Sequence, residues 1–166
     1  MSNLKPDAVF DGLQHIDLEF LKGHHIRGIL LDIDNTLFDM SYYLSEEIIN
    51  WVKSAKEKGF SILVLSNTYH KEKFEIIKSN LDIEIISFAK KPSKSGFLRA
   101  AKQMKLKNDE IAMIGDQIFT DVVGANRVGM FSIYVKPINK KEYWYTAWKR
   151  PIERMILKHY GYKFTG

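Results

Sequence analysis

Two kinds of hydrophobic pattern alternate along this chain. Short continuous apolar runs, rich in branched side chains, are typical of strands that are buried on both faces. Between these runs, apolar residues recur every three or four positions, which places them on one face of a helix. Strands are predicted at 27–33, 60–66, 83–87, 110–115 and 130–135, and helices at about 45–59, 70–81, 93–104 and 119–128.

The ends of these segments carry helix-capping residues. Ser45 is a candidate N-cap, because its hydroxyl can accept a backbone N–H of the first turn, and Gly59 is a candidate stop for the same helix. Ser93 or Ser95 caps the third helix in the same way. Strands that alternate with helices predict a single α/β domain, with a parallel sheet that is covered by helices on both faces.

Polar residues mark the carboxyl ends of three predicted strands. Asp32, Ser66 and Asp116 lie where the first, second and fourth strands end. Ligands of such sheets bind beyond these ends, at the point where the strand order reverses. A shared site would therefore make these three strands neighbours in the sheet, although they are not consecutive in sequence.

The segment Asp32-Ile33-Asp34 places two carboxylates two residues apart at one strand end. Asp32 is the candidate nucleophile toward a phosphate ester, and its attack would form an aspartyl-phosphate that water must hydrolyse. Asp34 is the candidate proton donor to the leaving group and the base toward that water. Lys91 is a third catalytic candidate, because an ammonium neutralises charge on phosphoryl oxygens, with Lys90 as its rival.

Anionic groups around an anionic substrate require a cation. Hard oxygen ligands favour Mg²⁺, and the candidate ligands are Asp32, Asp34 and Asp116. Asp121 is a supporting residue that acts through water or by orienting Lys91. The candidates for binding the phosphate group are Thr36, the hydroxyl of Ser66 and its neighbour Asn67.

Aspartates at strand ends also occur without any catalytic role. Aspartate commonly stabilises turns and helix caps there, which accounts for any one of these residues but not for four at matching places. The segment also begins like an EF-hand calcium loop. Its sixth position is Leu37, where glycine is needed, and its twelfth is Tyr43, where a glutamate is needed, so a calcium loop does not fit.

Composition and charge exclude some classes of function and location. The 166 residues contain no cysteine, which excludes disulfides and thiolate metal sites and makes a cytosolic location the expectation. No apolar run has the length of a transmembrane helix, and the start does not resemble a signal peptide. The net charge of +5 is concentrated in residues 136–166, where eight basic side chains face two acidic ones.

In order and spacing these motifs resemble those of haloacid dehalogenase (HAD) superfamily phosphatases, over residues 27–135. The similarity is closest to the YqeG-like group of subfamily IIIA, to which phosphatidylglycerophosphate phosphatases are related. Beyond the aspartates and Lys91, it is carried by Gly115-Asp116-Gln117-x-x-Thr120-Asp121-Val122, Pro6-Asp7 and Arg150-x-x-Glu153-Arg154. The motif Ser66-Asn67-Thr68 departs from the Ser-Asn-Asn that is usual in this group.

This resemblance implies a Rossmann-like fold, Mg²⁺ and an aspartyl-phosphate intermediate. Asp34 distinguishes the chain from related ion pumps, which have threonine there and accumulate the intermediate. The gaps after the first and second strands each hold one helix, so no cap domain is expected. An open site suits a phosphate on something large, such as phosphatidylglycerophosphate at a membrane surface.

The basic end, residues 136–166 outside the 27–135 core, also carries many aromatic residues. Two interpretations stay open for it: peripheral docking on anionic lipid, or an amphipathic helix that packs on the sheet. Ile152, Met155, Ile156 and His159 have the helical spacing for the second. No nucleic-acid-binding motif is recognised, so that partner is disfavoured.

The alternative function is a non-enzymatic or regulatory module that binds RNA, a ribosome or a protein through the basic end. Intact Asp32 and Asp34 argue against it, because binding alone requires neither. A carbon–halogen hydrolase is a further alternative. It is disfavoured because such enzymes do not need the metal-binding aspartates.

Overall fold

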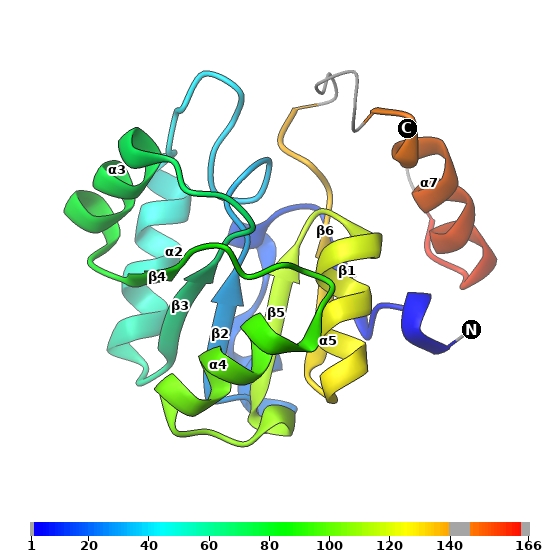
Figure 1. Ribbon diagram of the computed structural model, residues 1–166, viewed down its shortest axis with the longest axis horizontal. Helices are drawn as coiled ribbons and strands as arrows, with labels where there is room; N and C mark the ends of the chain where they lie inside the picture. Colours follow the sequence, from blue (N-terminus) through cyan, green and yellow to red (C-terminus); the bar gives the residue numbers. More distant parts are fainter. Residues whose placement is uncertain (1, 140–146, 164–166) are drawn as a thin grey trace.

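A computed structural model describes residues 2–139 and 147–163 and shows a parallel six-stranded sheet in the order β1-β6-β5-β2-β3-β4 (Figure 1). All the strands run in the same direction, so their carboxyl ends form one edge of the sheet, called here the carboxyl edge. The strands are β1 (Ala8–Phe10), β2 (Gly28–Leu31), β3 (Ser61–Leu65), β4 (Glu84–Ile86), β5 (Ile111–Gly115) and β6 (Phe131–Val135).

Helices connect these strands as the sequence pattern predicts. They are α1 (Leu18–Gly23), α2 (Glu46–Glu57), α3 (Lys71–Leu81), α4 (Lys94–Met104), α5 (Val123–Val128) and α7 (Lys149–His159). The hydroxyl of Ser45 accepts the backbone N–H of Ile48, as expected for the N-cap of α2. Short turns are η1 (Ser2–Leu4), η2 (Leu13–His15), η3 (Asn108–Glu110) and the π-helical turn η4 (Ile118–Val122).

The central strand β2 sends alternate side chains into two separate cores. Ile29 and Leu31 face α1, α2 and α3, whereas Leu30 faces α4 and α5. The whole strand is buried, because both faces of a parallel sheet are covered by helices. This explains why its sequence is a continuous apolar run and not an alternating one, and it confirms the predicted α/β class.

Residues 2–26 contain elements that the sequence pattern did not predict. β1 joins the sheet beside β6, with Val9 opposite Tyr134, and α1 packs on the same face as α2. A three-residue strand and a six-residue helix are too short to show a clear period, which explains why the pattern missed them.

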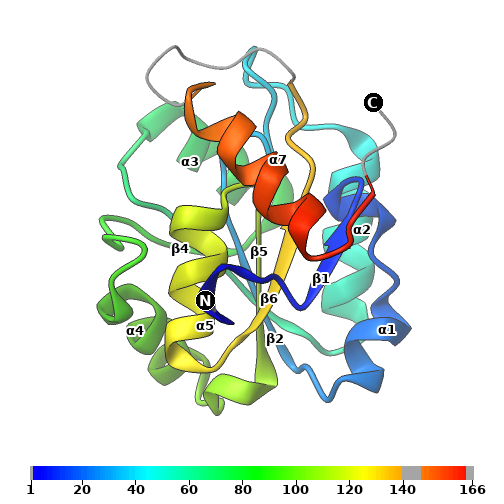
Figure 2. The ribbon, with the colours of Figure 1, turned by 90° about the vertical axis from the view of Figure 1, so that its right-hand side faces the viewer.

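The C-terminal helix α7 packs across the β1 and β6 side of the molecule (Figure 2). Its fully buried Leu157 contacts a small core with Ile118, Val122 and Tyr134. Tyr162 donates a hydrogen bond of 2.9 Å from its hydroxyl to the carbonyl of Pro6. The packed helix was one of the two interpretations of the basic end, but the residues that face the core differ from the expected stripe: Ile152 and Met155 are exposed.

Residues 32–45 and 66–70 connect β2 to α2 and β3 to α3 without an inserted domain, which confirms the expected absence of a cap. None of the helices among residues 2–139 and 147–163 is long and apolar enough to cross a membrane. The aromatic residues Tyr143, Trp144, Tyr145 and Phe164 of the basic end lie outside the described residues.

Candidate active site

Three adjacent strands bring the predicted site residues together. Asp32, Ser66 and Asp116 directly follow β2, β3 and β5, and β2 pairs with both of the other strands. The expectation that these three strands are neighbours is therefore confirmed. The chain order reverses at β2, from which β3 lies to one side and β5 to the other, so the site lies where parallel α/β sheets bind their ligands.

Lys91 links two of these carboxylates. Its Nζ lies 2.8 Å from Oδ1 of Asp32 and 2.8 Å from Oδ1 of Asp121, and only 3% of the side chain is exposed. The rival candidate Lys90 is exposed. Asn67 fixes the backbone of Lys91: its amide donates to the Lys91 carbonyl at 3.0 Å, and its Oδ1 accepts the Lys91 N–H at 2.6 Å.

Asp32, Asp116 and Asp121 form a cluster of carboxylates. One oxygen from each lies within 4.8 Å of the others, and both Asp116 and Asp121 are buried. The π-helical turn η4 directs Asp121 back over the end of β5, where a Cβ on Gly115 would lie only 2.2 Å from Oδ2 of Asp121. Gly115 is therefore required for this close approach.

Burial and mutual repulsion dominate the electrostatics of this cluster. Burial and the charge of Asp32 raise the pKa of Asp121 to about 7, against the opposing effect of Lys91. Burial, together with Asp32, raises the pKa of Asp116 well above its usual value. Burial on its own would lower the pKa of Lys91, but Asp121 and Asp32 outweigh it and raise that pKa.

The carboxylate oxygens of this cluster are crowded together, and the pKa values of the buried Asp116 and Asp121 are raised. Such a group suits a hard divalent cation, which would neutralise its negative charge. The group of three includes Asp121 and not Asp34, although Asp34 was among the expected ligands. The carboxylate of Asp34 is instead paired with Lys73 of α3, and 57% of its side chain is exposed. Lys73 is one of 20 lysines, and no feature of the sequence marked it.

The candidate phosphate-binding residues lie around this cluster. Thr36 is buried, and its hydroxyl is 3.5 Å from Oδ1 of Asp116. The hydroxyl of Ser66 donates to the Thr68 carbonyl at 3.0 Å and accepts the Thr68 N–H at 3.2 Å. The Asn67 side chain is engaged with the backbone of Lys91, which positions that lysine.

Arg150 of α7 also reaches the site. Its guanidinium contacts Asp116 at both the backbone carbonyl and Oδ2, and its Nη1 lies 2.9 Å from Oε2 of Glu153. Both residues occur in the sequence motif that carries the resemblance, but that motif alone did not place them in the site.

Comparison with known proteins fits this geometry. The family described as "Mitochondrial PGP phosphatase" matches residues 1–138. The chain belongs to this family. It is 35% identical over 153 residues to "Probable phosphatase YqeG" of Bacillus subtilis (strain 168), covering 92% of this chain and 88% of that protein.

A second relative is "Phosphatidylglycerophosphate phosphatase 1, chloroplastic/mitochondrial" of Arabidopsis thaliana. It is 25% identical over 146 residues, which are 82% of this chain and 42% of the plant protein. The chain thus spans less than half the length of that relative.

Among solved structures, the fold is similar to that of the deoxy-D-mannose-octulosonate 8-phosphate phosphatase of Haemophilus influenzae, in its cobalt-bound form. The TM-score is 0.53 at 15% identity, over 83% of this chain and 91% of that one. With the family match, this confirms the expected HAD fold. This member of the PGP phosphatase family is therefore a phosphoric monoester hydrolase, as the sequence predicted.

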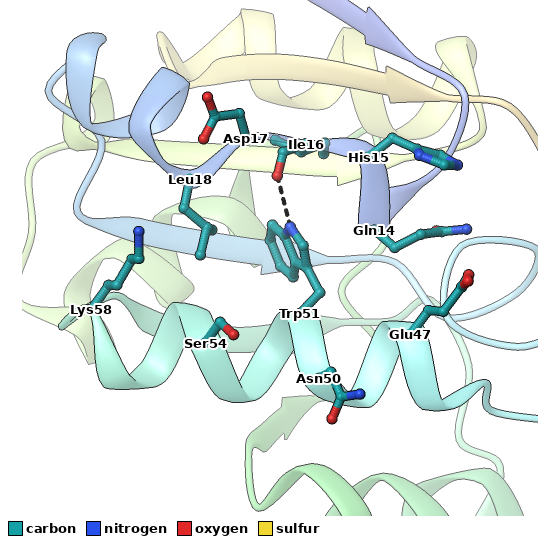
Figure 3. A pocket seen from close by; sticks show the side chains of 10 residues that line it. All are labelled: Gln14, His15, Ile16, Asp17, Leu18, Glu47, Asn50, Trp51, Ser54 and Lys58. Atoms are coloured by element: carbon teal, nitrogen blue, oxygen red, sulfur yellow. Dashed lines mark hydrogen bonds between the residues drawn. The ribbon is translucent and has the colours of Figure 1, made fainter.

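A groove on this phosphatase lies apart from the site. It has a volume of about 580 Å³ and lies between η2 and α1 on one side and α2 on the other (Figure 3). Trp51 lies along it and donates from Nε1 to the Ile16 carbonyl at 2.8 Å. None of the predicted site residues lines this groove.

Proposed function

We propose that the protein hydrolyses phosphate monoesters through a covalent intermediate on Asp32. The observation that carries this proposal is the arrangement of Asp32 beside the buried cation Lys91, at the edge of the aspartate cluster. Lys91 holds one oxygen of Asp32 and fixes the carboxylate at the end of β2.

In the first step, a carboxylate oxygen of Asp32 attacks phosphorus, the bond from phosphorus to the leaving oxygen breaks, and that oxygen takes a proton from Asp34. In the second step, water attacks the phosphorus of the aspartyl-phosphate and gives its proton to Asp34. Inorganic phosphate leaves and the Asp32 carboxylate is restored. Asp34 is suited to this role because its half-exposed side chain has access to water.

We propose Mg²⁺ as the cofactor, held by Asp32 and Asp116 with Asp121 in support, while the carboxylate of Asp34, which lies outside this group, serves proton transfer. When bound, the cation would neutralise negative charge on the phosphate. Lys91 would serve the same purpose, and we propose Thr36, Ser66 and Asn67 as the residues that bind the phosphate group.

For the substrate we propose phosphatidylglycerophosphate, or another phosphate that is presented on a large body or a membrane surface. The named activity of the plant relative supports this choice. No domain is inserted in the described connections after β2 and β3, which suits a substrate of this size.

The carboxyl edge also exposes apolar side chains. Of the nine large hydrophobic residues that are exposed in the described part of the chain, five lie in loops that directly follow the carboxyl ends of strands. These residues, called here the apolar rim, are Met40, Tyr43, Tyr69, Phe88 and Ile138. On α7, the exposed Ile152 and Met155 occur beside the exposed base Lys158. Exposed apolar groups with basic neighbours suit the surface of an anionic bilayer, so we propose peripheral contact with such a membrane.

Asp32→Asn tests the chemistry. This change keeps the size of the side chain and removes the nucleophile, so hydrolysis of p-nitrophenyl phosphate should be abolished, and EDTA should abolish it in the wild type. If the Asp32→Asn variant still hydrolyses the ester, the proposed mechanism is wrong.

A vesicle assay tests the substrate. Phosphate release from phosphatidylglycerophosphate in anionic vesicles should exceed release from soluble esters, and the protein should float with anionic but not neutral vesicles. If the protein turns over soluble esters but releases no phosphate from the lipid, the proposed hydrolase activity stands and the proposed lipid substrate is wrong.

The cytosolic location expected from the absence of cysteine stays a prediction.

A further inference from the structure

The aspartate cluster receives a side chain from outside the strand ends. Arg150 lies in the first turn of α7, beyond residue 138, where the family match ends. Its guanidinium donates to the Asp116 side chain at Oδ2 and to the Asp116 backbone carbonyl. Asp116 is fully buried and only 13% of the Arg150 side chain is exposed, so this contact lies in the interior beside the site.

Glu153 fixes this arginine and the helix that carries it. One of its oxygens lies 2.9 Å from Nη1 of Arg150, and the other accepts the backbone N–H of Ile118 at 2.8 Å. Ile118 begins η4, the turn that also holds Asp121. The buried Glu153 therefore joins α7 to the same turn that positions the cluster.

The two oxygens of Asp116 have different surroundings. Oδ2 is held by Arg150, and Oδ1 faces the Thr36 hydroxyl at 3.5 Å. The planar guanidinium holds one carboxylate oxygen and the backbone carbonyl of the same residue, so it ties the Asp116 side chain to its own backbone and limits the rotation of the carboxylate. When a residue hydrogen-bonds to a side chain that binds a metal, it orients that side chain and determines which lone pair faces the metal.

We propose that Arg150 is a positioning residue for the site: it holds Oδ2 of Asp116, so that Oδ1 is offered to the divalent cation. This inference rests on the proposed function, since it requires a cation at the aspartate cluster. It adds the C-terminal helix to a site otherwise built from strand ends.

Charge supports a positioning role. Among the described residues, the three carboxylates of the cluster outnumber the two cations that contact them, Lys91 and Arg150, and Arg150 also pairs with Glu153. A divalent cation is still attracted to the cluster. The guanidinium contacts Asp116 and Glu153, which hold it on the protein side of the cluster.

The test is Mn²⁺ binding to the full-length protein without substrate, measured by titration calorimetry and by electron paramagnetic resonance of free Mn²⁺. Arg150→Gln should weaken binding about 10- to 100-fold, the range found when partners behind a metal ligand are removed. Arg150→Lys should restore part of the loss. Arg154→Gln, an exposed arginine on the same helix, is the matched control and should bind like the wild type.

Kinetics with p-nitrophenyl phosphate separate positioning from substrate binding. For Arg150→Gln, the Mg²⁺ concentration at half-maximal rate should rise by the same factor as the Mn²⁺ dissociation constant. The KM for the ester at saturating Mg²⁺ should stay within about twofold of the wild type. Glu153→Gln should show a smaller shift in the same direction, because it loosens Arg150 without removing it.

Each remaining outcome has a distinct meaning. Unchanged or tighter Mn²⁺ binding in Arg150→Gln would overturn the proposal, and tighter binding would show that the guanidinium competes with the cation. A raised KM with unchanged Mn²⁺ binding would assign Arg150 to the substrate and would also overturn it. If the wild type binds no Mn²⁺, the proposal of a divalent cofactor is wrong, and the proposal for Arg150 is wrong with it. Should Arg150→Gln not fold, as judged by circular dichroism, Arg150→Lys and Glu153→Gln decide the question.

Discussion

Lys91 is the residue whose loss should change the protein most, because one buried ammonium serves two carboxylates. Its Nζ lies 2.8 Å from both Asp32 and Asp121, and the side chain is 3% exposed. Lys91→Met keeps most of the volume and the straight chain while removing the charge. The change leaves Asp32 and Asp121 facing each other, with Asp116 close by.

The magnitude follows from the burial of these groups. Removing one partner of a buried ion pair typically costs about 3–5 kcal/mol, because the remaining charge stays desolvated. For a chain of this size, each kcal/mol lowers the Tm by about 2–4 °C, so the metal-free variant should melt about 6–20 °C below the wild type. The unpaired carboxylates can take up protons instead, so the loss of stability should be larger at pH 8 than at pH 5.

Thermal unfolding in EDTA measures this loss, and p-nitrophenyl phosphate hydrolysis measures the function. Mg²⁺ should restore part of the lost Tm, because it neutralises the same carboxylates, while the hydrolysis rate should stay at least about 100-fold below that of the wild type. Adding Asp121→Asn to Lys91→Met should also recover stability in EDTA, since it removes one unpaired charge.

Lys90→Met is the matched control, because it changes the adjacent, exposed lysine in the same way. It should leave both the Tm and the rate close to the wild type. A Lys91→Met variant that melts within about 2 °C of the wild type in EDTA would refute the reasoning, and so would a Lys90→Met variant that is more damaging than Lys91→Met.

Three further predictions concern the same cluster. Gly115→Ala should lower both the Tm and the hydrolysis rate, because the new Cβ would lie 2.2 Å from Oδ2 of Asp121 and displace that carboxylate; unchanged kinetics would contradict this. Asn67→Ala removes two hydrogen bonds to the Lys91 backbone, so it should cost about 1–3 kcal/mol in denaturant unfolding and lower kcat; an effect on KM alone would favour direct substrate contact. Burial raises the pKa of Asp121 to about 7 and that of Asp116 above its usual value, so the folded, metal-free protein holds protons that the unfolded chain releases. Its Tm in EDTA should therefore fall as pH rises from about 4 to 7, and Mg²⁺ should reduce that fall; a Tm that rises over this interval in EDTA would be the opposite result.

Much of the sheet could be predicted from the chain, because strands buried on both faces leave a simple signal. β2, β3, β5 and β6 are mostly apolar, with Ser61 at the start of β3 and Ser132 inside β6, and all four lie within the predicted ranges. β1 pairs with β6 through only three half-buried residues, so its position depends on contacts distant in sequence that no local pattern reports.

The site, like the sheet, has residues that local sequence predicts and residues that depend on tertiary contacts. Asp32, Ser66 and Asp116 follow directly from strand ends, and parallel pairing brings them together without further information. The choice of Lys91 over Lys90 depends on which of two adjacent side chains the loop turns inward, and the structure places only Lys91 between the carboxylates. Lys73 has no signal in the sequence, because its ion pair with Asp34 depends on how α3 packs beside the β2 loop.

Arg150 shows why a motif can be noticed without its role being understood. At a spacing of three on a helix, Arg150 and Glu153 look like a surface ion pair, which contributes little to stability. The structure instead buries Glu153 against η4 and turns Arg150 toward Asp116, 34 positions earlier in the chain. The outer side of the same helix exposes Ile152 and Met155. One helix thus carries both the group that we propose orients a metal ligand and part of the surface that we propose meets the membrane. If the substrate lies in a bilayer, as we propose, the orientation of Asp116 and the docking of α7 would depend on the same packing contacts.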